Sequence, residues 1–163
     1  MTVAQDFKGA LSSWASGVSV VTTASEGMLY GLTVSSFSSL SLDPPLVLVC
    51  LNNANRMPAM IEVSGGFAVS ILAKGQESAS AYFARTGRMP TPDFVEIEGE
   101  YTANGQPVIQ GALAYVVCRL HQKIEQGDHT IIIGEVLEAS HRTDGEALVY
   151  WRRAYHGLPA GPG

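Results

Sequence analysis

The sequence predicts a mainly β protein, built as an antiparallel barrel with a few short helices. Short runs rich in β-branched residues recur along the chain, and Gly, Pro, Asn and Asp bound them, as expected of antiparallel strands. Only two or three segments show helical spacing, and they do not alternate with strands as a doubly wound parallel sheet requires. The GxGxxG pattern of a Rossmann nucleotide site follows none of the predicted strands.

The length predicts one domain, which we place at residues 1–156. The chain has 163 residues, of which 46% are hydrophobic and only 15% charged. A surface with so few charges has apolar area that a second subunit could cover, so we expect a homodimer. The net charge of −5 and the scattered Lys and Arg residues argue against a nucleic-acid partner. Without a signal-peptide pattern or an apolar run of about 18 residues, we expect a cytoplasmic protein that does not bind membranes.

The first elements are a helix and a hairpin. Residues 4–15 place apolar side chains, among them Phe7 and Trp14, at helical spacing, which indicates an amphipathic helix. The β-branched run of residues 18–23 comes next, followed by the turn sequence Ser-Glu-Gly. We therefore expect this run to pair with residues 28–35 as an antiparallel hairpin.

The central stretch, residues 31–52, reads GLTVSSFSSLSLDPPLVLVCLN and combines hydroxyl side chains with strand character. Asp43-Pro44-Pro45 cannot continue a ladder, so it predicts a stiff turn between two extended segments. The apolar run of residues 46–51 is too short to cross a bilayer and predicts a strand buried on both faces. The hydroxyls suit a polar, planar or phosphorylated ligand, although a solvated strand face would have the same composition.

The remaining chain predicts two more helices and several strands. Pro58 suits the first turn of a helix, and the preceding loop with Asn55 and Arg56 is a plausible anion site. Cys50 and Cys118 lie in apolar runs, so we expect free thiols, and we expect no metal site. The expected elements are a helix over 58–65, a strand over 66–72, a helix over 76–85, a loop with short strands over 89–105, strands over 112–120, 121–125, 131–139 and 147–151, and a flexible tail over 157–163.

Four motifs in order carry a resemblance to a known family. Besides the central stretch they are Gly66–Leu72, Gly111–Ala114, and Gly127-Asp128-His129 followed by Ile133–Val136. Together they resemble the flavin reductase-like family of small NAD(P)H:flavin oxidoreductases, which includes reductase components of two-component flavin monooxygenases. The resemblance implies a six-stranded Greek-key FMN-binding split barrel with flanking helices, which dimerises with the flavin near the subunit interface.

The resemblance also implies the residues of two binding sites. Asn55 and Arg56 stand where members of the family commonly carry Ser or Thr for the flavin phosphate, so the chain departs from the pattern there. His129 is the one candidate catalytic residue, at the border of the nicotinamide pocket. The implied flavin residues are Thr33, Val34, Ser35, Ser36, Ser39, Leu40, Cys50, Leu51, Asn52, Asn55, Arg56, Phe83 and Arg88, and the implied nicotinamide dinucleotide residues are Asp128, His129, Tyr150, Trp151 and Arg152.

The implied function is reduction of FMN or FAD by NADH or NADPH, with the reduced flavin passing to a partner monooxygenase. For hydride transfer from nicotinamide C4 to flavin N5, the protein mainly has to position the two reactants. This fits a sequence without a metal cluster or nucleophile motif. Two alternatives stay open. One is a flavin- or haem-binding module without turnover, and the other is an oxidase that resembles pyridoxamine phosphate oxidase.

Overall fold

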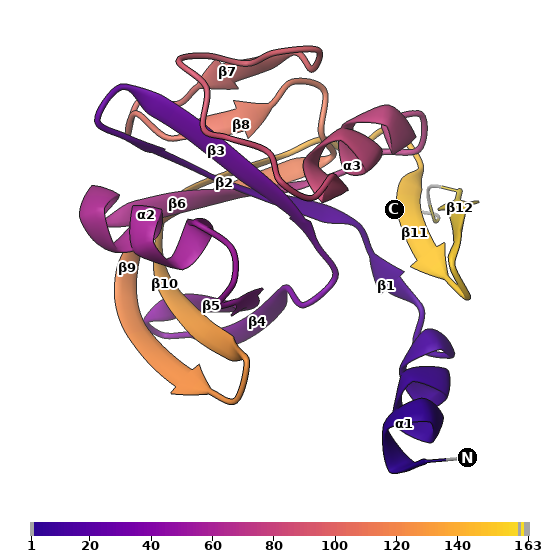
Figure 1. Ribbon diagram of the computed structural model, residues 1–163. Coiled ribbons are helices and arrows are strands. Elements are labelled where there is room, and N and C mark those ends of the chain that lie inside the picture. The colour runs from indigo at the N-terminus through magenta and orange to yellow at the C-terminus, as the bar shows by residue number, and fades with distance from the viewer. Residues whose placement is uncertain (1, 160, 162–163) are drawn as a thin grey trace.

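The computed structural model describes residues 2–159 and 161, which form a mainly β fold with short helices (Figure 1). No helix in this part of the chain is long and apolar enough to cross a membrane. The elements are, in chain order, α1 (Val3–Ser12), β1 (Ser16–Gly17), β2 (Ser19–Ser25), β3 (Met28–Val34), β4 (Ser38–Leu42), β5 (Pro45–Asn52), α2 (Met57–Ser64), β6 (Gly66–Ile71), α3 (Glu77–Ala84), β7 (Gly99–Tyr101), β8 (Pro107–Ile109), β9 (Ala114–Gln126), β10 (His129–His141), β11 (Ala147–Trp151) and β12 (Ala154–Leu158).

The main sheet has seven antiparallel strands in the order β3-β2-β6-β9-β10-β5-β4. The mainly β, antiparallel prediction is confirmed, but the expected count of six strands is wrong. The difference comes partly from β4, because the hydroxyl-rich segment pairs with β5 across the Asp-Pro-Pro turn. The runs 112–120 and 121–125 also join into the single strand β9. In the described residues β3 and β4 are opposite edges with no ladder between them, so the barrel is not closed.

The sheet curls because its two longest strands bend. The β9–β10 ladder shifts register between Ile133 and Gly134 and again between Val136 and Glu138. Such bulges add twist and turn a strand away from a flat sheet. In Figure 1 this pair runs from the layer of β2, β3 and β6 down to that of β4 and β5. One apolar core fills the space between these layers and includes Val21 of β2, Val49 of β5 and Phe67 of β6.

Strand β5 buries one face only, which corrects the expectation of two buried faces. Val47, Val49 and Leu51 are buried, whereas the alternate side chains, Cys50 among them, are half-buried. The sequence LVLVCL is apolar at every position and therefore hides this alternation. The physical reason is the place of β5 beside the edge strand β4, where one face packs on the core and the other borders a groove.

Helices α2 and α3 pack on the sheet. Helix α2 buries Met57, Pro58 and Ile61 and ends at Gly65, whose φ of 72° is the left-handed C-cap conformation that glycine favours. Helix α3 buries Tyr82 and Phe83 near β3. Both helices lie within two residues of the predicted bounds, because Pro58 and the terminal glycine mark α2 and apolar spacing marks α3.

Helix α1 forms where a helix was expected, but it ends at Ser12, before Trp14, and buries none of its residues. Phe7, Leu11 and Trp14 are mostly exposed, with Trp14 at 76%. Figure 1 shows the helix extending away from the sheet. Its C-terminal end is attached to β11, because the Trp151 Nε1 donates to the Ser13 carbonyl at 3.1 Å and the Arg152 N–H donates to the Ser12 carbonyl at 3.1 Å.

Strand β12 was not predicted, and it forms a small sheet with β1 and β11. Gly157 and Leu158, which open the segment expected to be a flexible tail, are its last residues. Residues 160 and 162–163 of that segment lie outside the described residues. Arg152 and Arg153 make the two-residue turn from β11 to β12 with φ of 47° and 65°, a conformation that non-glycine residues adopt rarely.

Candidate functional site

A groove of about 390 Å³ lies where the end of β3, the end of β5, the start of β10 and the end of α3 converge. We call it the central groove. It is lined by Leu32, Thr33, Val34, Ser35, Ser36, Cys50, Leu51, Asn52, Asn55, Phe83, Ala84, Arg85, Thr86 and His129.

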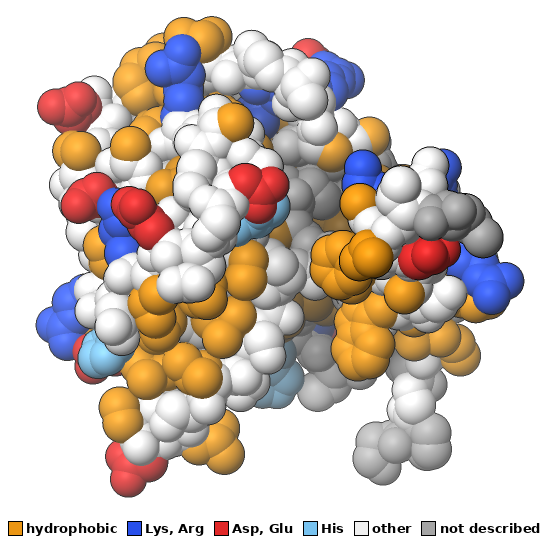
Figure 2. Space-filling model, turned by 60° about the horizontal axis from the view of Figure 1, so that its bottom comes forward, with side chains coloured by type: hydrophobic (Ala, Val, Ile, Leu, Met, Phe, Trp, Pro, Cys, Tyr) orange, Lys and Arg blue, Asp and Glu red, His pale blue; other side chains and the backbone are white. Residues whose placement is uncertain are grey.

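A second hollow, of about 250 Å³, shares Thr33, Val34, Ser35 and Ala84 with the central groove. We call it the tyrosine pocket, because Tyr150 and Tyr155 complete it together with Val18 and Ser80. Figure 2 shows the surface hollowed between the large body and the smaller lobe on the right, the side on which Figure 1 places the C-terminal hairpin. The two hollows therefore adjoin along the end of β3.

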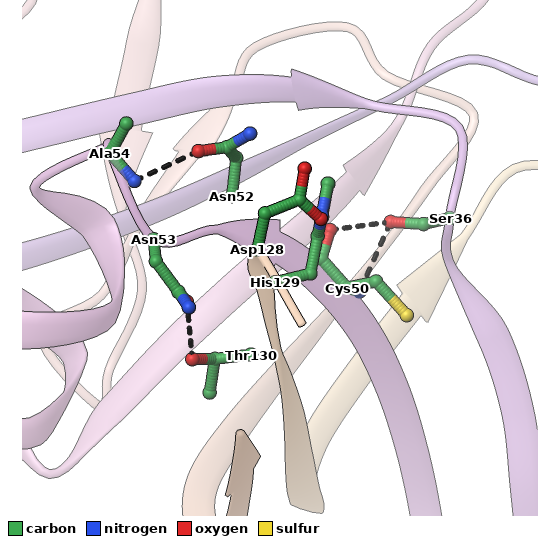
Figure 3. Close-up of polar contacts among 8 residues, drawn as sticks. All are labelled: Ser36, Cys50, Asn52, Asn53, Ala54, Asp128, His129 and Thr130. Atoms are coloured by element: carbon green, nitrogen blue, oxygen red, sulfur yellow. Dashed lines mark hydrogen bonds and ion pairs between the residues drawn. The ribbon is translucent and has the colours of Figure 1, made fainter. Parts of the chain in front are cut away.

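Two predicted hydroxyls hold the walls of the groove together. The Ser36 hydroxyl donates to the Cys50 carbonyl at 2.9 Å and accepts from the Cys50 N–H at 3.1 Å, so it fastens the bend after β3 to β5 (Figure 3). The Thr33 hydroxyl donates to the Ser80 carbonyl at 2.7 Å and so ties β3 to α3. These two side chains fix the shape of the groove, while Ser35 is exposed at the junction of both hollows.

The corner with His129 is fixed by paired turns. His129 begins β10 and pairs in register with Asn52 at the end of β5. The Asn52 side chain accepts from the Ala54 N–H at 2.8 Å, and the Thr130 hydroxyl donates to the Asn53 side chain at 2.6 Å (Figure 3). The loop before α2 is thus joined to the β9–β10 turn. Sequence reasoning missed the roles of Asn53 and Thr130, which only the pairing of β5 with β10 reveals.

Asp128 and His129 form an adjacent acid–imidazole pair. The Asp128 Oδ1 lies 2.7 Å from the His129 Nδ1. This hydrogen bond, with the attraction of the imidazole, holds the pKa of the Asp128 carboxyl below its usual value. Because an ionised carboxylate only accepts, Nδ1 carries the proton, and in the neutral ring Nε2 keeps the lone pair. Asp128 therefore sets the tautomer of the histidine that borders the central groove.

Phe83 forms the floor of the groove, and Gly31 sets its distance from β3. A Cβ on Gly31 would lie 2.6 Å from the Phe83 ring, closer than real contacts allow, so only glycine admits this packing. Arg88 lies near the same ring, with its guanidinium carbon 4.8 Å from the Phe83 centroid and 4.3 Å from that of Tyr82. Its Nη1 donates to the Gly31 carbonyl at 2.8 Å. Arg88 thus supports the wall and is not among the residues that line the groove.

Several predicted residues lie away from the central groove. Ser39 and Leu40 are exposed on the edge strand β4. The Arg56 guanidinium lies 3.5 Å from the sulfur of Met89, in a different groove. Trp151 and Arg152 face α1, with the guanidinium 4.7 Å from the indole centroid.

The groove also has lining residues that the sequence did not reveal. Arg85 and Thr86 stand at the end of α3 and supply polar groups there. The sequence signal for them is an Arg-Thr-Gly run at the end of a predicted helix. The Arg85 guanidinium forms an exposed ion pair with Glu96 at 3.2 Å. The other missed lining residues are Leu32 and Ala84 of the central groove, and Val18, Ser80 and Tyr155 of the tyrosine pocket.

Comparison with known proteins decides the family. Residues 11–159 match the flavin reductase like domain. The chain belongs to this family. The match spans all strands of the main sheet and both hollows, so the resemblance seen in the sequence motifs is confirmed.

The relatives of this flavin reductase-like domain agree with one another. It is 45% identical over 148 residues to the FMN reductase (NADH) SmoA of Agrobacterium fabrum, which covers 90% of this chain and 81% of that protein. It is 40% identical over 152 residues to the reductase component of the 4-hydroxyphenylacetate 3-monooxygenase of Thermus thermophilus, with 93% and 95% covered. The Streptomyces globisporus NADH:FAD oxidoreductase SgcE6, solved with NAD and FAD fragments, superimposes with a TM-score of 0.87 at 32% identity, with 94% and 92% covered.

The two cysteines should differ sharply in reactivity. Burial raises the pKa of the Cys118 thiol to about 12, so at pH 8 roughly one molecule in ten thousand carries the thiolate. Cys50 is half-buried and lines the central groove. A disulfide reagent added to the native protein at pH 8 should therefore modify one thiol per chain, and the second only after unfolding. The Cys50→Ser variant is the control and should show no rapid reaction. Two thiols reacting at similar rates in the native protein would contradict the assignment.

Proposed function

We propose that this protein is an NADH-dependent flavin reductase that supplies reduced FMN or FAD to a separate flavin-dependent monooxygenase. The observation that carries the proposal is the shared wall of the two hollows, formed by Thr33, Val34 and Ser35. A flavin in the central groove and a nicotinamide beside the tyrosine pocket would meet along this wall. The identity to relatives named as NADH-dependent flavin reductases supports the same reaction.

The residues of the central groove fit a flavin. A planar ring system needs apolar faces with a few polar groups along its edge. Leu32, Val34 and Phe83 supply apolar surface, while Ser35 at the bend after β3 and Asn52 at the end of β5 supply polar side chains. Asn55, with Arg85 and Thr86, supplies polar groups for a phosphate. We assign the phosphate to this end of the groove, because Arg56 lies elsewhere. We also interpret the curled sheet as a split barrel that stays open between β3 and β4.

The protein contributes position, because the redox chemistry belongs to the two bound molecules. When they are bound, the flavin accepts a hydride at N5 from nicotinamide C4. The fixed bend at Ser36 and the rigid floor at Phe83 hold the groove in one shape, which favours a productive distance between the reactants. His129 borders the groove with its tautomer set by Asp128, and we assign it to contact with the nicotinamide. The cytoplasmic location stays a prediction.

The central test is turnover with flavin as a diffusible substrate. NADH oxidation should depend on added FMN or FAD, and protein purified without flavin should be colourless. Arg85 is the one arginine among the described residues that line the groove, and it is paired with Glu96, so we expect a flavin Kd in the micromolar range, about −8 kcal/mol. Fluorescence titration gives the Kd. Yellow protein that keeps stoichiometric flavin through dialysis would favour an oxidase, and flavin binding without NADH oxidation would favour a binding module.

His129→Ala should separate donor binding from flavin binding. Loss of the imidazole should raise the KM for NADH about tenfold, equivalent to ~1.4 kcal/mol, while the flavin Kd stays within about threefold. His141→Ala is the matched control, since His141 is an exposed residue at the far end of the same strand. A collapse of flavin binding in a folded His129→Ala protein would place the histidine in the flavin site instead.

We propose that a second copy of this chain covers the apolar side of α1. Phe7 and Leu11 of α1, with Trp14 just after the helix, form an exposed apolar stripe, and a segment this apolar on one side requires a partner. Light scattering should give twice the chain mass of 17.3 kDa at micromolar concentration. Leu11→Glu should shift the protein toward monomer. A wild-type protein that is monomeric with and without flavin would contradict this assembly.

A further inference from the structure

A third hollow, of about 440 Å³, separates α1 from the tip of the β11–β12 hairpin. We call it the cationic groove, because Lys8, Arg152 and Arg153 line it together with Gln5, Gly9 and Ser12. All three cationic residues are exposed. The α1 residues that line the groove lie on the side of the helix opposite to Phe7 and Leu11. The groove therefore lies on the polar side of α1.

The charges of this groove are not balanced within the chain. The protein has a net charge of −5, and five of its ten Lys and Arg residues form ion pairs with carboxylates. In residues 2–159 and 161, neither Lys8 nor Arg152 nor Arg153 takes part in such a pair. Like charges that share one hollow repel, and a bound anion with several oxygens would replace this repulsion with charge-assisted hydrogen bonds.

The hairpin tip carries its arginines in an unfavourable backbone conformation. A two-residue turn with positive φ at both positions is typically Asn-Gly, whereas here both residues are arginine, with φ of 47° and 65°. Backbone strain of this kind persists where the surrounding contacts enforce it, and it concentrates at binding sites. Here the enforcing contact is the hydrogen bond from the Arg152 N–H to the Ser12 carbonyl, which holds the tip against α1.

The same hairpin connects the cationic groove to the tyrosine pocket. Tyr150 and Tyr155 face each other across β11 and β12, with ring centroids 5.3 Å apart, and both line the tyrosine pocket. Arg152 follows Tyr150 by two residues, which is about 7 Å along a strand. This span is comparable to the reach from a nicotinamide ring across one ribose to the first phosphate of a dinucleotide.

We propose that the cationic groove binds the pyrophosphate of the reduced nicotinamide dinucleotide through Lys8, Arg152 and Arg153, while the nicotinamide lies beside the tyrosine pocket. The proposal rests on the proposed function, since it names the residues that hold the donor of that reaction. The proposal gives α1 a role in binding the hydride donor, although none of the family motifs lies in this helix.

The first experiment replaces the two arginines of the hairpin tip by Asn-Gly, the sequence that this turn conformation favours. The double variant Arg152→Asn/Arg153→Gly relieves the strain, so its Tm should equal or exceed that of the wild type. Its KM for NADH should rise at least tenfold. Its KM for dihydronicotinamide riboside, which has no phosphate, should stay within twofold. Arg119→Ala removes an exposed arginine of β9 that does not line the groove, and it should leave both KM values unchanged. Equal effects on both donors, or no effect on NADH, would overturn the proposal.

The second experiment does not depend on turnover. ADP-ribose carries the pyrophosphate without a nicotinamide, and calorimetry should detect its binding to the wild type and a loss of at least tenfold in Lys8→Ala and in the double variant. If ADP-ribose binds in this way but NADH does not reduce flavin, the proposed function fails while the anion site stands. If ADP-ribose affinity is unchanged, or if the double variant raises the KM for FAD and not for NADH, the groove does not serve the donor.

Discussion

The antiparallel ladder between β9 and β10 determines where every other part of the site lies. The pair is long enough to serve both layers, because β9 pairs with β6 and β10 pairs with β5. Its register shifts at Gly134 and Val136 bend it, and that bend brings the end of β5 beneath the end of β3. His129 and Asn52 meet because β10 begins its pairing with β5 there, at the end of β5. A straight ladder would give a flat sheet without the central groove.

The central groove is shaped by hydroxyl groups whose hydrogen bonds are already made within the protein. The Ser36 and Thr33 hydroxyls are used between β3 and its neighbours, so they fix the walls and leave few free donors. What remains for a ligand is apolar surface, backbone and a small polar end at Arg85 and Thr86. Such a site suits a flat molecule that enters and leaves, since neither a cluster of cations nor an enclosed cavity holds it.

Much of the fold could be predicted from local patterns, and most of the errors have a common cause. The hairpin of β2 and β3, the strand β6 and the helices α2 and α3 follow from β-branched runs, proline and glycine. Strand β12 reads AYHGL, which has neither β-branched residues nor alternation, and it forms because β11 offers a partner edge. Tyr155 was missed for the same reason. Pairing between distant segments leaves no local signal.

The site residues show the same limit. Thr33, Ser36 and Cys50 lie on one continuous stretch of sequence, and all three line the central groove. Arg56 and Arg85 are both arginines next to a helix end, and only the packing of α2 and α3 puts the second at the groove and the first outside it. The ligand contacts of all these residues stay predictions, since local sequence gives position along the chain and not direction in space.

The contact between Gly31 and Phe83 links the volume of the groove to the substitutions that the core can accept. The ring occupies the space that a Cβ at position 31 would need. A side chain there would require a smaller residue at position 83, and the same exchange would deepen the floor of the central groove. A side chain at position 31 therefore requires a smaller residue at position 83 beforehand or at the same time, and a protein of this fold that widens its groove by this route must redesign the packing between β3 and α3.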